Sequence, residues 1–254
     1  MIFFRQTFGV ARRILTEYRR QRRTLIFWVV FPALMLLFDL IYANKTAMAA
    51  SRDTTPAGIL IGAALFFSCL GGTVSIIVAE RERRTLRRLL VSPLSPAAYF
   101  LGIVLALSVV AGLQTLIVYG LAHSIGARFH GSVLLGAVIV ALSVFAFVGL
   151  GFFFGALFAK RAEDVNGPVA AFGVPLLVLA GTWFPVSLLP PFLLRVAWFD
   201  PIFHMNQALK GVAGQGLGWA DVSASLAFLS AFAAASLGLG VAAYRRMLAA
   251  EKRA

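Results

Sequence analysis

The sequence predicts an all-α integral membrane protein that crosses the bilayer six times. Three observations indicate this class: the composition, the length of the apolar stretches and the placement of basic residues. Hydrophobic residues make up 60% of the 254 residues and charged residues only 13%, against roughly 45–50% and about 25% in average soluble proteins. A chain this apolar lacks the polar surface that a soluble core requires, so lipid must be its solvent.

Six apolar stretches have the length of a membrane span. A bilayer core of about 30 Å needs about 20 helical residues, because each residue rises about 1.5 Å. The third to sixth stretches contain no Lys, Arg, Asp or Glu. The expected spans are 25–43, 58–79, 98–122, 133–158, 167–184 and 222–244.

The first span admits an alternative, because Ala47-Met48-Ala49 has the small-residue pattern of a signal-peptide cleavage site. A basic region of 23 residues precedes this span, which also contains Trp28 and Pro32 where signal peptides have a short Leu/Ala core. These features favour an uncleaved span.

The basic residues alternate between the two sides of this topology. Eighteen Lys and Arg residues fall in 1–24, 80–96, 160–166 and 245–254, and five fall in 44–57, 124–132 and 185–221. Because cytoplasmic loops are enriched in Lys and Arg, both termini are expected in the cytoplasm, with the chain in the cytoplasmic (inner) membrane. The net charge of +13 therefore indicates orientation rather than nucleic-acid binding.

The first 23 residues predict an amphipathic helix on the inner membrane surface. Apolar residues recur every three or four positions, and basic residues take the other side, facing lipid headgroups. A simple orientation signal for the first span is the alternative. The apolar side comprises Phe4, Phe8, Ala11, Leu15 and Tyr18, and the polar side comprises Arg5, Arg12, Arg13, Thr16, Arg19 and Arg20.

The segment after the second span, residues 80–92, predicts a short cytoplasmic helix that ends near Pro93. Its leucines share one face, and Glu80 precedes Arg84 by four residues, the favoured order for a helical ion pair. Ser95-Pro96 is then the expected cap and first turn of the third span. Such a helix forms a docking surface for a partner protein, and a solvated basic loop is the alternative. The docking residues are Glu80, Arg81, Glu82, Arg83, Arg84, Thr85, Leu86, Arg87, Arg88, Leu89 and Leu90.

The segment after the fifth span, residues 185–205, is too apolar for a free loop, and its prolines prevent one continuous helix. We expect short re-entrant helices that dip into the outer leaflet, and a plain interfacial connector is the alternative. The residues that carry this pattern are Phe184, Pro185, Leu189, Pro190, Pro191 and Pro201.

The sequence lacks several chemical signatures. It has no phosphate-binding Gly-x-x-x-x-Gly-Lys-Ser/Thr motif, and its three histidines have no acidic or cysteine neighbours at metal-ligand spacing. We therefore expect neither a metal site nor a cofactor in this chain. Asp39 is the one ionisable candidate within a span, which gives little support to an ion-driven secondary transporter or a membrane enzyme. Both remain alternatives. Gly151 and Gly155 form a step that can admit close helix contact, within the subunit or beyond it.

Two of these motifs resemble a known family, the membrane permease subunits of ABC exporters of the second export class. Residues Glu80 to Pro93 are similar to the family's signature after the second span, and the prolines after the fifth span are similar to its external pattern. With the amphipathic start and six spans, the resemblance covers nearly the whole chain. It implies the fold shared with sterol and multidrug half-transporters.

The resemblance also implies a function. Two six-span subunits, either two copies of this chain or this chain and a homologue, would form a dimer. A separate ATPase subunit would bind ATP and Mg, leaving this chain non-catalytic. An apolar or amphiphilic cargo is expected, because a charged one would need compensating groups along its route. The second and fifth spans would line the path, although core or lipid packing is the alternative for each candidate: Phe66, Phe67, Leu70, Phe172, Leu176 and Leu179.

Overall fold

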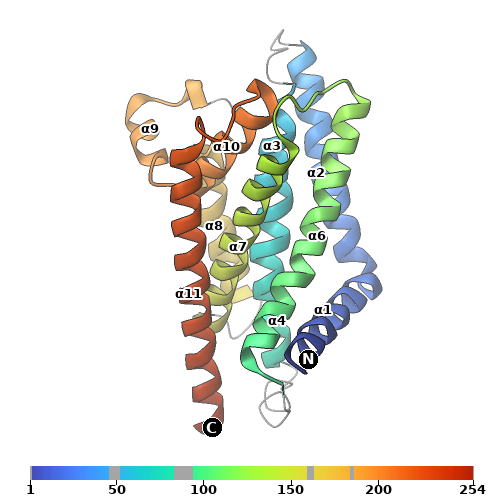
Figure 1. Cartoon of the computed structure of the whole chain (residues 1–254), viewed down its shortest axis with the longest axis vertical. Helices are drawn as coiled ribbons and strands as arrows, with labels where there is room; N and C mark the ends of the chain where they lie inside the picture. Colours follow the sequence, from blue (N-terminus) through green and yellow to red (C-terminus); the bar gives the residue numbers. More distant parts are fainter. Residues whose placement is uncertain (1, 46–51, 83–93, 159–162, 184–185, 254) are drawn as a thin grey trace.

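The structure is a computed structural model that describes residues 2–45, 52–82, 94–158, 163–183 and 186–253. All regular elements in these ranges are helices, and the long ones run side by side in a bundle (Figure 1). The elements are α1 (Ile2–Arg20), α2 (Arg22–Lys45), α3 (Thr55–Ile59), the π-helix η2 (Leu60–Gly71), α4 (Gly72–Glu82), α6 (Pro96–Ser124), α7 (Val133–Leu157), α8 (Glu163–Leu179), the 3-10 helix η3 (Val186–Leu188), α9 (Pro191–Ala197), α10 (Pro201–Gln215) and α11 (Ser223–Arg253).

Four continuous helices in the described residues are long and apolar enough to cross a membrane: Thr55–Glu82, Pro96–Ser124, Val133–Leu157 and Ser223–Ala250. The pair α1 and α2, bent by 82°, gives a fifth if it counts as one span. Helix α8 has 17 residues, fewer than the roughly 20 that a span needs. The all-α membrane class is thus confirmed, and the count of six spans stays a prediction.

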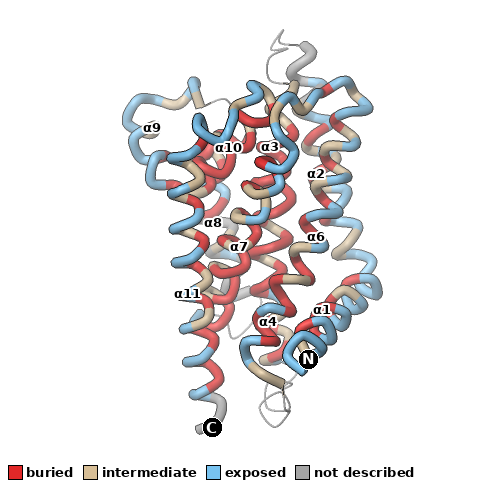
Figure 2. The backbone as a smooth tube through the Cα atoms, viewed as in Figure 1, coloured by how far each residue is buried: buried red, intermediate tan, exposed pale blue. Residues whose placement is uncertain are grey.

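The second span, formed by α3, η2 and α4, lies at the centre of the bundle. Its most apolar window is 78% buried, whereas the corresponding window of α11 is 28% buried. Figure 2 shows this contrast as a buried interior with exposed positions along α11. The second span therefore contacts most of the other long helices and can transmit a movement to them.

A polar contact joins three helices inside this apolar core. Pro32 lies within α2, and because proline has no N–H, the Trp28 carbonyl four residues earlier loses its helical donor. Gln114 of α6 supplies the replacement, with its Nε2 3.0 Å from the Trp28 oxygen, and its Oε1 accepts from Ser68 Oγ at 2.8 Å. Gln114 thereby gives the Trp28 carbonyl the hydrogen-bond donor that its own helix lacks at Pro32.

Glycines bring α7 against two neighbours. A Cβ at Gly151 would lie 2.6 Å from Thr73 Cβ, and one at Gly155 would lie 3.2 Å from Ile77 Cδ1. The predicted close contact therefore exists, and in this chain it is packing within the subunit against the second span. Towards α11, a Cβ at Gly149 would lie 2.5 Å from the Ser236 carbonyl carbon.

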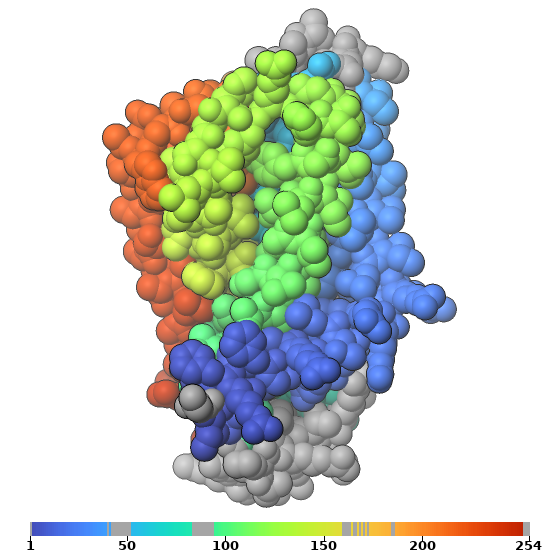
Figure 3. All heavy atoms as spheres, turned by 45° about the vertical axis from the view of Figure 1, so that its right-hand side comes forward, coloured from blue at the N-terminus to red at the C-terminus, as the bar shows by residue number. Residues whose placement is uncertain are grey.

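The first helix forms where the sequence predicts it, but its orientation differs. Helix α1 buries Val10, Ile14 and Tyr18 rather than the full predicted stripe, while Phe4 and Phe8 are 67% and 62% exposed. The reason is the neighbour: α1 lies across α6 (Figure 3), and a Cβ at Gly102 would meet Val10 Cβ at 2.6 Å. Protein covers one face of α1, and two of its aromatic side chains remain outside that contact.

Both termini lie at one end of the molecule, and α9 and α10 lie at the opposite end (Figure 1). The predicted break after the fifth span is present, because α9 and α10 begin at Pro191 and Pro201. Helix α10 continues to Gln215 and so extends beyond the predicted limit at residue 205. Phe184 and Pro185 lie outside the described residues.

Candidate functional site

The candidate site lies where α4 ends and α6 begins, at the end of the bundle that holds the chain termini (Figure 1). Glu80, Arg81 and Glu82 form the last turn of α4. The other predicted docking residues, from Arg83 to Leu90, lie outside the described residues. The structure thus describes the residues on either side of this segment. We call residues 80–82 the first root and residues 94–96 the second root.

Glu80 is the centre of the first root. It follows Thr73 and Ile77 at steps of four and three, and all three are buried, which is the spacing of one helical face. A buried carboxylate needs partners, because its desolvation is costly. Here the guanidinium of Arg13 on α1 and the hydroxyl of Tyr99 on α6 both donate to it.

The second root is also attached to α1. Ser95 caps α6, its Oγ accepting from the Ala98 N–H at 3.2 Å, as expected from the Ser95-Pro96 pair. The Ser95 N–H in turn donates to Gln6 Oε1 on α1 at 3.3 Å. Helix α1 therefore contacts the chain on both sides of the 83–93 segment.

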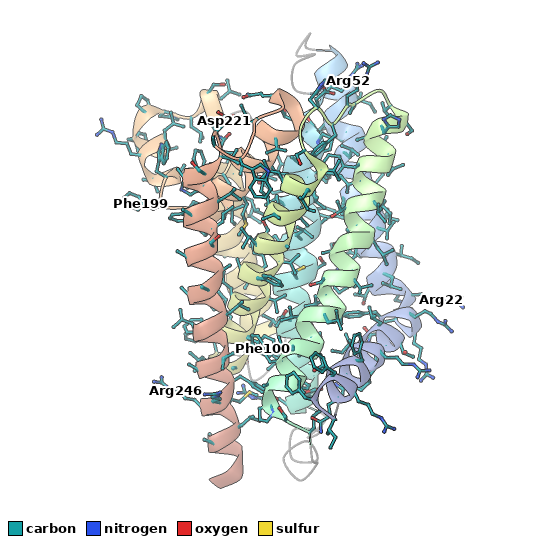
Figure 4. The ribbon with its side chains drawn as sticks, viewed as in Figure 1. Arg22, Arg52, Phe100, Phe199, Asp221 and Arg246 are labelled. Atoms are coloured by element: carbon teal, nitrogen blue, oxygen red, sulfur yellow. The ribbon has the colours of Figure 1, made fainter. Side chains whose placement is uncertain are left out.

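Further contacts extend from this point to α7 and α11. Arg81 Nη2 donates to the Ala156 carbonyl at 2.7 Å, near the end of α7. The Tyr99 ring stacks on Tyr244 of α11 with centroids 5.4 Å apart, and Phe152 of α7 packs edge-on against Tyr244 at 5.6 Å. Figure 4 labels Phe100 and Arg246 at this end of the bundle. Displacement of the first root would therefore reach α1, α6, α7 and α11.

Arg13, the basic member of the Arg13–Glu80 pair, is permanently charged. Partial burial lowers the pKa of the Arg13 guanidinium, but the hydrogen bond and charge of Glu80 outweigh this effect and raise it. Arg13 thus stays protonated throughout the working pH range, and the contact does not depend on its titration. We call Arg13, Glu80 and Tyr99 the coupling node.

The sequence pattern placed one of these residues, Arg13, in a different environment. Arg13 was expected to face solvent or headgroups, whereas it contacts a residue 67 positions away. The expected partner of Glu80, Arg84, lies outside the described residues. The spacing of Glu80 from Thr73 and Ile77 was an available signal that Glu80 faces the bundle interior.

The candidate path residues occupy different environments. Phe66 and Leu70 are 4% and 3% exposed, so the alternative of core packing describes them in this conformation. Phe66 contacts α8, where a Cβ at Gly173 would lie 2.3 Å from its ring. Phe67 packs edge-on against Phe31 of α2. On α8, Leu176 is 39% exposed, Leu179 is partly buried, and Phe172 lies in the same helix.

At the opposite end, two of the histidines have structural partners. His130 Nε2 lies 2.7 Å from Asp53 Oδ2, and His204 Nε2 lies 3.0 Å from the Trp198 carbonyl. Slight burial raises the pKa of the Asp53 carboxyl, but hydrogen bonds from the Arg128 N–H and His130 outweigh this and lower it. In the described part of the chain, no three His, Cys, Asp or Glu residues form a metal-binding group. Leu189 and Pro190 precede α9.

Comparison with known proteins adds independent findings. A family profile described as ABC-2 family transporter protein matches residues 43–242. The probable multidrug ABC transporter permease YbhR of Escherichia coli K12 is 31% identical over 139 residues, which cover 54% of this chain and 37% of that protein. The inner membrane transport permease YhhJ of the same organism is 27% identical over 181 residues, covering 69% and 47%.

The probable doxorubicin resistance ABC transporter permease protein DrrC of Mycobacterium tuberculosis H37Rv is 25% identical over 226 residues, covering 85% of this chain and 79% of that protein. The alignments to the two E. coli permeases span less than half of their lengths.

Proposed function

The chain belongs to the ABC-2 family of transporter proteins, and we propose that it is the membrane half of an ATP-driven exporter. As an ABC-type permease it requires an ATPase partner. The sequence contains no phosphate-binding loop motif, so ATP and Mg would bind to that partner subunit. This family membership also weighs against the alternatives of a secondary transporter or a membrane enzyme.

The observation that carries the mechanism is the attachment of both roots of the 83–93 segment to α1, through Arg13–Glu80 and Gln6–Ser95. Residues 80–92 form the docking helix in this proposal, with Leu86, Leu89 and Leu90 towards the ATPase. Closure of two ATPase subunits displaces this helix, and the coupling node conveys the displacement to α4, α6 and α11. The segment and α1 then move as one unit.

The wider assembly follows from the same proposal. The chain forms a single transmembrane domain over residues 1–254, crosses the inner membrane six times and keeps both termini in the cytoplasm. It pairs with a second copy or a homologous permease, and α1 contacts inner-leaflet lipid. The helices after α8 form the external re-entrant segment. The alternation of basic residues in the sequence supports this orientation.

We assign the cargo to apolar or amphiphilic molecules exported from the cytoplasm or the inner leaflet. Two relatives are named for multidrug and doxorubicin resistance transport. The path candidates on the second span and α8 are apolar, and a strongly charged cargo would need compensating charges along the route. Among the candidates whose side chains the structure describes, Phe67, Leu176 and Leu179 are exposed or partly exposed.

Co-purification tests the docking role. The double variant Leu86→Asp and Leu89→Asp places two charges on the proposed docking face, where burial without partners is costly. When the chain is co-expressed with candidate ABC ATPase subunits of the same genome, the double variant should no longer retain the ATPase that the unmodified chain retains. Asp substitutions at Ala249 and Ala250, exposed in the tail after the sixth predicted span, provide a control for two added charges. Undiminished recovery of the ATPase with Leu86→Asp and Leu89→Asp would remove the docking role.

A further inference from the structure

Backbone and side-chain hydrogen bonds close the end of α8 that lies opposite the chain termini. Gly181 has a positive φ of 69°, and the Thr182 N–H donates to the Leu177 carbonyl at 3.1 Å while the Gly181 N–H donates to Val178 at 3.0 Å. This pattern is a Schellman motif, which satisfies two of the last carbonyls of a helix. The carbonyls of Ala180 and Gly181 then need donors from elsewhere.

Two side chains of α10 supply those donors. Asn206 is fully buried, and its Nδ2 donates to the Ala180 carbonyl at 3.3 Å and to Thr182 Oγ1 at 2.9 Å. Lys210, one turn later, donates from its ammonium to the Gly181 carbonyl. Helix α10 therefore binds the end of α8 through polar contacts at adjacent turns.

The second span packs against Thr182 and Lys210. A Cβ at Gly58 would lie 2.4 Å from the Thr182 carbonyl oxygen and 3.0 Å from Lys210 Cε, and one at Gly62 would lie 2.2 Å from Thr182 Cγ2. A side chain at either glycine would push an unmodified Thr182 away. We call these five residues the outer junction: Gly58, Gly62, Thr182, Asn206 and Lys210.

Lys210 adds a charged hydrogen bond to the packing of the outer junction. Its ammonium is partly buried and donates to the Gly181 carbonyl, so it joins α10 to the end of α8. Taking an ammonium out of water costs free energy that an apolar residue of similar size would not. Such a group stabilises this arrangement strongly and a displaced arrangement poorly, because displacement takes the ammonium away from the Gly181 carbonyl.

We propose that Asn206 and Lys210 are positioning residues that latch the end of α8 against the second span, and that each transport cycle requires the outer junction to part. The inference rests on the proposed function, in which the second span and α8 border the substrate path. The structure shows the junction closed. Release of the Lys210 and Asn206 contacts frees the end of α8 and opens the route between these two helices.

A reversible crosslink tests this requirement. Gly62→Cys and Thr182→Cys are suited to the crosslink, because a Cβ at position 62 would lie 2.2 Å from Thr182 Cγ2, which is the atom that a cysteine sulfur would replace. In the complex with its ATPase subunit, reconstituted in lipid nanodiscs, oxidation should lower the ATP hydrolysis rate by about tenfold, because a gate held shut stops the cycle. Dithiothreitol should restore the rate, and neither single-cysteine variant should respond to oxidation. The proposal would be overturned if the complex, shown by mass spectrometry to be crosslinked, hydrolysed ATP as fast as the same complex after dithiothreitol treatment.

A second measurement uses this chain alone and does not need an ATPase. Lys210→Met should increase amide hydrogen exchange in residues 177–183 by about tenfold, because the local opening free energy falls when the latch is lost. Lys210→Arg, which keeps a cationic donor, should preserve most of the protection, and Arg195→Met on exposed α9 is the charge-matched control. Unchanged exchange in Lys210→Met would contradict the latch. If no ATPase associates with the chain, the proposed function fails while this exchange result still decides the latch.

Discussion

At the scale of single residues, the polar side chains inside the bundle lie where the helical backbone lacks a partner or where two helices must be held together. Gln114 replaces the donor that Pro32 cannot supply, and Asn206 completes the end of α8. Each contact joins residues far apart in the sequence. Since an unpaired buried polar group costs about 1–3 kcal/mol, these residues fix the relative positions of their helices as well as adding stability.

The coupling node gives a prediction at this scale. Arg13→Met removes a cation that contacts the buried Glu80 carboxylate, and we expect it to destabilise the chain by about 1–3 kcal/mol. The Arg13 side chain is 41% exposed, so solvent screens the pair and favours the lower part of that range. Arg12→Met, on the exposed side of α1, should change stability little.

A double-mutant cycle in mixed micelles measures the pair directly. Arg13→Met and Glu80→Gln together should cost less than the sum of the single substitutions by about 0.5–2 kcal/mol. Strictly additive effects would show that the two side chains do not stabilise each other. The same variants can be assayed for ATP hydrolysis with the partner subunit, where the coupling role predicts a lower rate.

Sequence reasoning at the residue scale identified motifs better than partners. The Ser95 cap followed from local spacing, because the donor lies only three residues away. The contact between Glu80 and Arg13 could not be found in this way, since it depends on how α1 crosses the bundle. Periodicity likewise defines an apolar face but does not say whether lipid or protein covers each part of it, so the contact of α1 with α6 could not be predicted.

At the scale of the elements, helix contacts depend on glycines that leave no room for a side chain. Helices α7 and α11 meet at Gly149 and Gly240, where a Cβ at Gly240 would lie 2.6 Å from the Gly149 carbonyl oxygen. The Gly151–Gly155 step was visible in the sequence, whereas its partner, the second span, was not. A short motif of small residues predicts close approach without naming the approaching helix.

Substitution of Gly149 tests this packing. A Cβ there would meet backbone atoms of α11 at 2.5–2.7 Å, so Gly149→Ala should lower the unfolding free energy by about 1–3 kcal/mol through overpacking. Gly238→Ala is the matched control on α11, because a Cβ at that position meets no atom within 4 Å. It should be neutral or stabilising by about 0.5–1 kcal/mol, since alanine favours the helix. Equal effects of the two substitutions in chemical unfolding would contradict the close α7–α11 contact.

At the scale of the whole molecule, composition and apolar length predicted the class because they reflect the solvent rather than any particular contact. A helix overlaps each predicted span in the described residues, although the second is divided into α3, η2 and α4 and the fifth ends at Leu179. The change to a π-helix over Leu60–Gly71 could not be predicted, since it depends on the packing around a buried span. The external segment was predicted as broken because proline acts locally.

The central claim of this account is topological. The chain places its termini at one end of the bundle (Figure 1), and the coupling mechanism requires residues 80–92 to lie on the cytoplasmic side, where ATP is available. The positive-inside distribution of Lys and Arg predicts this orientation. All proposals about docking and coupling depend on it.

A reporter fused after Arg88 tests that claim most directly. Alkaline phosphatase, which folds only outside the cytoplasm, should be inactive at this position, and green fluorescent protein fused at the same residue should fluoresce. An active phosphatase after Arg88, with a non-fluorescent green fluorescent protein, would place the segment outside and contradict both the topology and the coupling mechanism.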